Sequence, residues 1–157
     1  MFKLPKETLW RQWAPLPLRL IIGYGFMAHG WAKLSRGTEG FAKLLEQIHA
    51  PLPEVTAWVS TLVEVLGGLA ILAGAFVAVV SVPLIVMMLV AMFTIHLRYG
   101  FSAINTIGLT VDGPQFGPPG YEINLLYIAA LLALVLGGGG PFSIDRLLAR
   151  RKGEPAT

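Results

Sequence analysis

The chain has 157 residues and a mass of 17.0 kDa, with 55% hydrophobic and only 13% charged residues. This charged fraction is about half of the roughly 25% typical of soluble domains, and the mean hydropathy is +0.67. The composition excludes an ordinary soluble enzyme, a disordered tail and a nucleic-acid-binding module, even though the net charge is +3 and the pI is about 9.5. The chain has no cysteine, which excludes disulfides, thiolate metal sites and c-type haem attachment.

The first predicted membrane span covers about residues 15–34. Arg19 and Lys33 bracket an uncharged stretch at 20–32, and both side chains can snorkel toward a membrane interface. A signal peptide is the alternative for this segment. We favour the span because Arg19 interrupts the apolar region and His29 stands where a cleavage site would have small, uncharged residues.

An amphipathic helix is predicted next, over about residues 38–49. Its apolar positions recur with helical spacing at Phe41, Leu44, Leu45 and Ile48, and Lys43, Glu46 and Gln47 lie between them. A helix of this type lies in the membrane interface. We therefore expect the four apolar side chains to face the bilayer or the helix bundle.

Two further spans are predicted between residues 54 and 97, where Glu64 is the only formal charge after Glu54. A single helix of that length would measure about 66 Å, roughly twice the hydrocarbon thickness of a bilayer. Two helices near 54–73 and 76–97, joined by a turn at Gly74, fit better. Pro83 should kink the second helix without ending it.

The segment 99–120 is rich in glycine and proline and predicts irregular turns that cap the bundle. A fourth span follows at about 121–138, within a stretch without formal charge at 123–144. The expected fold class is therefore all-α, an integral membrane four-helix bundle with a short interfacial helix in the first outer loop. Residues 1–150 form one domain, and 151–157 form a basic cytoplasmic tail.

The distribution of basic residues predicts the orientation. Four spans place both termini on one side, where seven Lys and Arg residues lie, against four on the opposite side. The positive-inside rule then favours both termini in the cytoplasm. We expect a multi-pass protein of the bacterial inner (plasma) membrane whose main contact is the lipid bilayer.

Ionisable residues inside the membrane are the strongest functional signal, because a charge there costs roughly 3 kcal/mol or more. Given alternating span directions, four helices bring one such side chain each to the outer half, at His29, Glu64, His96 and Glu122. We expect these four to line one polar pocket and to be its catalytic residues, with Glu64 deepest. Glu64 is either neutral or paired with a cation such as Lys33.

The small residues of the fourth helix predict which of its faces packs against the other helices. Ala129, Ala133 and Gly137 lie within about 60° of Glu122 around a helix, and small residues form helix-contact faces. This pattern turns Glu122 into the bundle and Asn124 away from it. Gly67 and Gly68, one turn after Glu64, indicate a second close-packing face.

Each candidate also has a structural interpretation. Arg19 and Lys33 can be interfacial anchors, His96 and Glu122 wet interface residues, and Glu64 half of an ion pair. Two His and two Glu can bind a divalent metal, and two facing His can hold haem. Neither His pair has a tight local spacing, so a metal or haem site is disfavoured.

The chain resembles the DoxX family of small four-span bacterial membrane proteins. The resemblance rests on the motifs Leu18-Arg19-Leu20, His29-Gly30-Trp31-Ala32-Lys33, Glu64-Val65-Leu66-Gly67-Gly68, His96, Gly120-Tyr121-Glu122-Ile123-Asn124-Leu125-Leu126 and Ser143-Ile144-Asp145. Relatives include a subunit of an archaeal thiosulfate:quinone oxidoreductase and membrane proteins tied to quinone, thiol or oxidative-stress chemistry. The resemblance therefore implies a membrane redox role.

The leading hypothesis is a quinone-linked redox component, in which the His and carboxylate side chains of the pocket exchange protons. Lys33, Tyr121 and Asn124 would help to bind a quinone, and electrons would come from a redox partner protein or a reduced substrate. Whether the chain is itself an enzyme or forms a homo-oligomer is open; no nucleic acid is expected. The alternatives are a non-catalytic scaffold that recruits redox enzymes and, ranked lowest, a proton-coupled transporter of small molecules.

Overall fold

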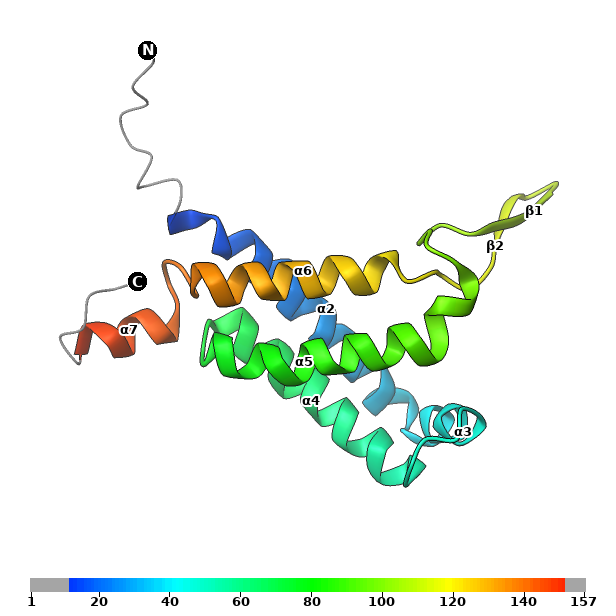
Figure 1. Cartoon of the computed structure of the whole chain (residues 1–157), viewed down its shortest axis with the longest axis horizontal. Coiled ribbons are helices and arrows are strands. Elements are labelled where there is room, and N and C mark those ends of the chain that lie inside the picture. The colour runs from blue at the N-terminus through cyan, green and yellow to red at the C-terminus, as the bar shows by residue number, and fades with distance from the viewer. Residues whose placement is uncertain (1–11, 152–157) are drawn as a thin grey trace, which may run out of the picture.

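The computed structural model describes residues 12–151, and these are mostly helical. Four long helices, α2 (Pro15–Arg36), α4 (Pro53–Ala73), α5 (Val77–Ala91) and α6 (Glu122–Gly137), form two packed pairs. Helix α2 lies against α4 and α5 lies against α6, while α4–α5 and α2–α6 contacts join the pairs. Figure 1 shows the α2–α4 pair crossing the α5–α6 pair obliquely.

Two helices in the described part of the chain are long and apolar enough to cross a membrane. They are Pro53–Ala73, with a mean hydropathy of 1.8, and Val77–Tyr99, with 2.6. Helix α6 is apolar but has only 16 residues. Helix α2 has 22 residues, and Arg19, His29, Lys33 and Arg36 lower its hydropathy.

The turn between α4 and α5 lies at the predicted residue. Gly74 ends α4 in the left-handed conformation, with φ 66°, and its N–H bonds to the carbonyl of Ile71. Helix α5 continues through Pro83 and then loosens into a π-helical turn at Met92–His96 and a 3₁₀ turn, η2, at Leu97–Tyr99. The predicted helix bounds of 54–73 and 76–97 are confirmed to within a few residues.

Glycines allow α2 and α4 to approach closely. A Cβ atom on Gly68 would lie 2.5 Å from the backbone nitrogen of Met27, and one on Gly23 would lie 2.7 Å from that of Leu72. Gly30 faces Val65 with equally little space. This is the small-residue packing common between membrane helices, and it confirms that Gly68 lies on a close-packing face.

The prediction for the face of α6 was wrong. Asn124, Leu131 and Leu134 are buried, whereas Ala129 and Ala133 are exposed, as is Gly137. Tyr127 shares the buried face and packs edge-on against Phe26, with ring centroids 5.2 Å apart. Large side chains fill the space between α6 and its neighbours, so the small residues are left on the outer surface.

Helix α3 (Glu39–Gln47) forms where an amphipathic helix was predicted. Leu45 is buried, and Phe41, Leu44 and Ile48 are half-buried. The apolar face thus packs toward the neighbouring helices. Figure 1 shows α3 where α2 ends and α4 begins. Its placement in a membrane interface stays a prediction.

The segment 99–120 is more regular than predicted. Strands β1 (Thr106–Thr110) and β2 (Gly113–Phe116) pair antiparallel, with Thr110 opposite Gly113. Figure 1 shows this hairpin projecting away from the helices instead of capping them. The protein is therefore mostly helical, as expected, and one short β-hairpin that was not predicted is added to the helices.

A further helix, α7 (Ile144–Arg151), was not predicted and extends one residue into the supposed tail. The Asp145 carboxylate accepts hydrogen bonds from the backbone N–H groups of Phe76 (2.6 Å) and Val77 (3.0 Å), at the start of α5. A carboxylate at a helix N-terminus is favourable because the unpaired N–H groups carry partial positive charge. The rest of the predicted tail, 152–157, lies outside the described residues.

Candidate functional site: a buried lysine–glutamate pair

Glu64 and Lys33 form a direct ion pair between α4 and α2. The Lys33 Nζ donates to Glu64 Oε1 at 2.7 Å, and the side chains are 7% and 23% exposed for Glu64 and Lys33. Lys33 also lies over the Phe41 ring, 4.0 Å from its centroid, so α3 covers its outer side. Glu64 therefore has the cationic partner that the sequence left open.

The second oxygen of Glu64 has no hydrogen-bond partner among the described residues, although it is buried. A buried, unpaired carboxylate oxygen is costly and calls for an explanation. Helices α2 and α4 are close together at this point, because Gly30 of α2 lies directly against Val65 and Glu64 of α4. This close approach keeps the Glu64 side chain between the two helices. The pair thus has one satisfied and one free acceptor.

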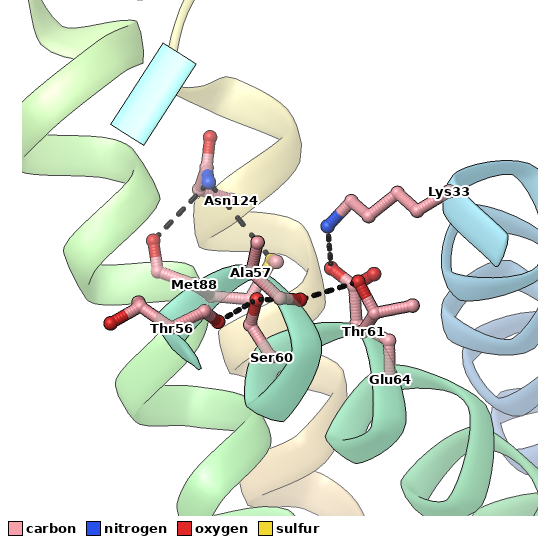
Figure 2. A network of polar contacts seen from close by, with 8 residues as sticks. All are labelled: Lys33, Thr56, Ala57, Ser60, Thr61, Glu64, Met88 and Asn124. Atoms are coloured by element: carbon pink, nitrogen blue, oxygen red, sulfur yellow. Dashed lines mark hydrogen bonds and ion pairs between the residues drawn. The ribbon is translucent and has the colours of Figure 1, made fainter. Parts of the chain in front are cut away.

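Other polar side chains lie in the same part of the helices (Figure 2). Thr61 is fully buried and donates to the carbonyl of Ala57, one turn back in α4. Asn124 is 4% exposed and donates to the Met88 carbonyl at 3.2 Å, just before the π-helical turn of α5. Figure 2 shows Lys33 reaching toward Glu64, while Asn124 points to α5.

The other predicted site residues do not join this pair. His29 is exposed on α2. His96 Nδ1 lies 3.0 Å from the Pro119 carbonyl, and because a carbonyl only accepts, this nitrogen carries the hydrogen and leaves Nε2 free. Glu122 accepts from the Ala103 N–H at 2.8 Å and so fixes the start of the loop. Their shared pocket and catalytic roles are not shown.

Tyr121 also belongs to the loop anchor. Its ring packs edge-on against Phe101, with centroids 5.5 Å apart, and its N–H bonds to the Gly100 carbonyl. Gly120 beside it leaves no room for a Cβ atom against the carbonyls of Gly100 and Ser102. The motif Gly120-Tyr121-Glu122 thus holds segment 100–103 against the start of α6. These contacts explain all three residues of the motif without a ligand.

Arg19 is a buried residue of the opposite end, and the prediction that it snorkels was wrong. It is 2% exposed and donates to five backbone carbonyls, two at the end of α4 and three in the loop before α7. The shortest of these bonds join Nη1 to Gly139 (2.6 Å) and Nη2 to Leu72 (2.7 Å). Sequence reasoning missed this anchor together with its neighbour Asp145.

Two hollows open on the surfaces of α2, α3 and α4, and neither Lys33 nor Glu64 lines them. One of about 780 Å³ opens between α3 and the start of α4, with Trp58 in its wall, and one of about 600 Å³ runs along α2 and α4. Among residues 12–151, no group of three or more His, Asp or Glu side chains is placed to hold a metal ion.

Comparison with known proteins gives one match. The model of the DoxX family matches residues 14–97, more than half of the chain, from the start of α2 to the end of the π-helical turn. The matched part contains Arg19, Lys33 and Glu64. No curated protein and no solved structure matches the chain.

Proposed function

We propose, given that the chain belongs to the DoxX family and is a membrane protein, that it is a quinone-linked redox component acting through Lys33 and Glu64. The observation that carries this proposal is the buried ion pair with its free carboxylate oxygen. The electrons would come from a redox partner protein or a reduced substrate, because the chain has no cysteine. It would thus be a subunit of an oxidoreductase.

The two residues fit a quinone carbonyl chemically. A bound quinone supplies the capacity to take up two electrons and two protons. Lys33 has two further N–H donors beyond the one given to Glu64, and these can bond to a carbonyl oxygen. Glu64 Oε2 can accept and release a proton, and the partly exposed Lys33 connects the pair to the outer solvent.

Substitution of Glu64 tests the proposal. Glu64→Gln keeps the size of the side chain and its hydrogen bond to Lys33 but removes the titratable group. We expect a folded protein whose quinone-dependent turnover, measured in reconstituted membranes with the natural partner proteins, falls at least about 100-fold, the lower end for general acid–base catalysis. Glu54→Gln, on the exposed start of the same helix, is the matched control and should keep full turnover.

Retention of turnover by Glu64→Gln would assign Glu64 a structural role and refute the proposal. The same conclusion follows if the wild-type protein with its partners neither binds a quinone nor changes quinone reduction. The transporter alternative gains no support, because Arg19, the main polar residue of the other end, is fully engaged with carbonyl oxygens.

The β-hairpin favours a second candidate function, a scaffold that recruits redox enzymes. Ile107, Leu109, Val111 and Phe116 are all at least 60% exposed on this projecting element, and clustered exposed apolar side chains mark interaction surfaces. Replacing residues 106–116 by a short Gly-Ser loop should preserve the helices and abolish co-purification of the partner. A truncated protein that still co-purifies with its partner at wild-type levels would exclude the hairpin as the recruiting element.

A further inference from the structure

A groove of about 600 Å³ runs along the outer surface of α2 and α4. Ala28 and Ala32 line it between larger side chains, with Tyr24 and Trp31 on α2 and Leu69 on α4. Neither Lys33 nor Glu64 lines this groove. It is therefore independent of the proposed redox site.

The groove suits an apolar group, because most of its lining residues are apolar. Its volume falls in the range of about 300–1,000 Å³ typical of small-molecule sites. Tyr24, Trp31 and Leu69 are 59%, 65% and 47% exposed, so these walls face the surroundings of a membrane protein, not its core. Lipid tails are the apolar chains that fill such surfaces in a bilayer.

One end of the groove is cationic. Arg36, the last residue of α2, lines it together with Ser35 and is exposed. The single ion pair found among residues 12–151 joins Lys33 and Glu64, so Arg36 pairs with no carboxylate in that part of the chain. A guanidinium group binds phosphate oxygens in a bidentate manner.

We propose that this groove is a binding site for a phospholipid with a negatively charged headgroup. The acyl chain lies over Ala28 and Ala32, between Trp31 and Leu69, and the phosphate binds Arg36. The small residues determine whether any lipid fits, while the arginine determines the preference for an acidic one. These two contributions can be separated by substitution.

The test is native mass spectrometry of the purified full-length protein with phosphatidylglycerol or phosphatidylcholine added. We expect one tightly retained phosphatidylglycerol and weaker retention of phosphatidylcholine. Arg36→Gln should lower phosphatidylglycerol retention about fivefold, the effect of one basic residue near an anionic lipid, without changing phosphatidylcholine. Ala28→Leu, which fills the groove, should lower the retention of both lipids, and Ala32→Leu is the second variant for the same effect.

Two matched controls separate the groove from the rest of the surface. Ala129→Leu adds the same bulk to an exposed position on α6, and Arg98→Gln removes an exposed arginine in η2; both should bind lipid as the wild type does. Unchanged retention in folded Ala28→Leu and Ala32→Leu proteins, or an unchanged acidic preference in Arg36→Gln, overturns the proposal. Displacement of phosphatidylglycerol by an equimolar isoprenoid quinone would likewise overturn it.

Discussion

Arg19 is a buried cation whose hydrogen-bond partners are all backbone carbonyl oxygens. Two of these belong to Ile71 and Leu72 in the last turn of α4, where the carbonyl groups carry partial negative charge. The others come from 139, 141 and 142, so one side chain ties together α2, α4 and the loop before α7. The sequence shows the charge, but its partners lie up to 123 positions away and contribute only backbone atoms.

Replacing Arg19 by Met should destabilise the protein strongly. It removes five donated hydrogen bonds and leaves buried carbonyls unpaired, which we expect to cost at least about 3 kcal/mol. Unfolding by sodium dodecyl sulfate, followed by circular dichroism, measures this free energy. Arg98→Met, at an arginine that lies over the Tyr99 ring on the exposed surface, should change it by less than about 1 kcal/mol; an equal loss in both variants would contradict the anchor.

The site could be predicted from the sequence only in part. A carboxylate in the middle of a span is expected to be either neutral or paired with a cation such as Lys33. The structure has the Lys33–Glu64 pair. Asn124 was predicted to face away from the bundle, but it is buried. His29 was predicted to line a shared pocket, but it is exposed. Depth along a helix follows from residue number, whereas rotation about the helix axis depends on which neighbour packs best, which no single sequence states.

Among the elements, those with strong local signals agree with the structure. Gly74 ends α4 and the apolar period of 41–48 gives α3. The hairpin had a local signal that was overlooked, since Asp112-Gly113, directly after the β-branched Thr110 and Val111, is a dipeptide that favours a tight turn. The local signal for the face of α6 was misleading, because small residues can face lipid as well as another helix.

The contact between α2 and α4 depends on the absence of side chains at its glycines. Gly68→Ala should force the helices apart, because the new Cβ atom would lie 2.5 Å from a backbone nitrogen that cannot move alone. We expect a loss of about 1–3 kcal/mol in the free energy of unfolding, as for other overpacked sites. The Lys33–Glu64 pair should weaken in the same variant, because its two side chains come from these helices.

Gly40→Ala is the matched control for this prediction. Gly40 lies in α3 with no atom within 4 Å of an added Cβ. Alanine has the higher helix propensity by up to about 1 kcal/mol, so this variant should be as stable as the wild type or slightly more stable. Equal destabilisation by both substitutions would contradict the close-packing explanation, because an added Cβ atom on Gly40 meets no neighbour.

At the scale of the whole molecule, the two ends differ in structure and in charge. Helix α3 and the hairpin lie at one end and α7 at the other (Figure 1). The end with α7 carries Arg146, Arg150 and Arg151, and its polar groups are locked by Arg19 and Asp145. The end with α3 holds the partly accessible ion pair. If all four long helices span the bilayer, the ion pair faces the outside and the arginines face the cytoplasm.

Labelling of single cysteines tests this orientation directly, because the chain has no native cysteine to interfere. Lys43→Cys on α3 and Arg150→Cys on α7 are both at exposed positions. In intact spheroplasts, a membrane-impermeant maleimide should label position 43 and should label position 150 only after lysis. Labelling of both positions from outside would place α3 and α7 on the same side and refute the three spans predicted between them. Labelling of position 150 alone would keep the spans but invert the protein, which would turn the Lys33–Glu64 pair toward the cytoplasm.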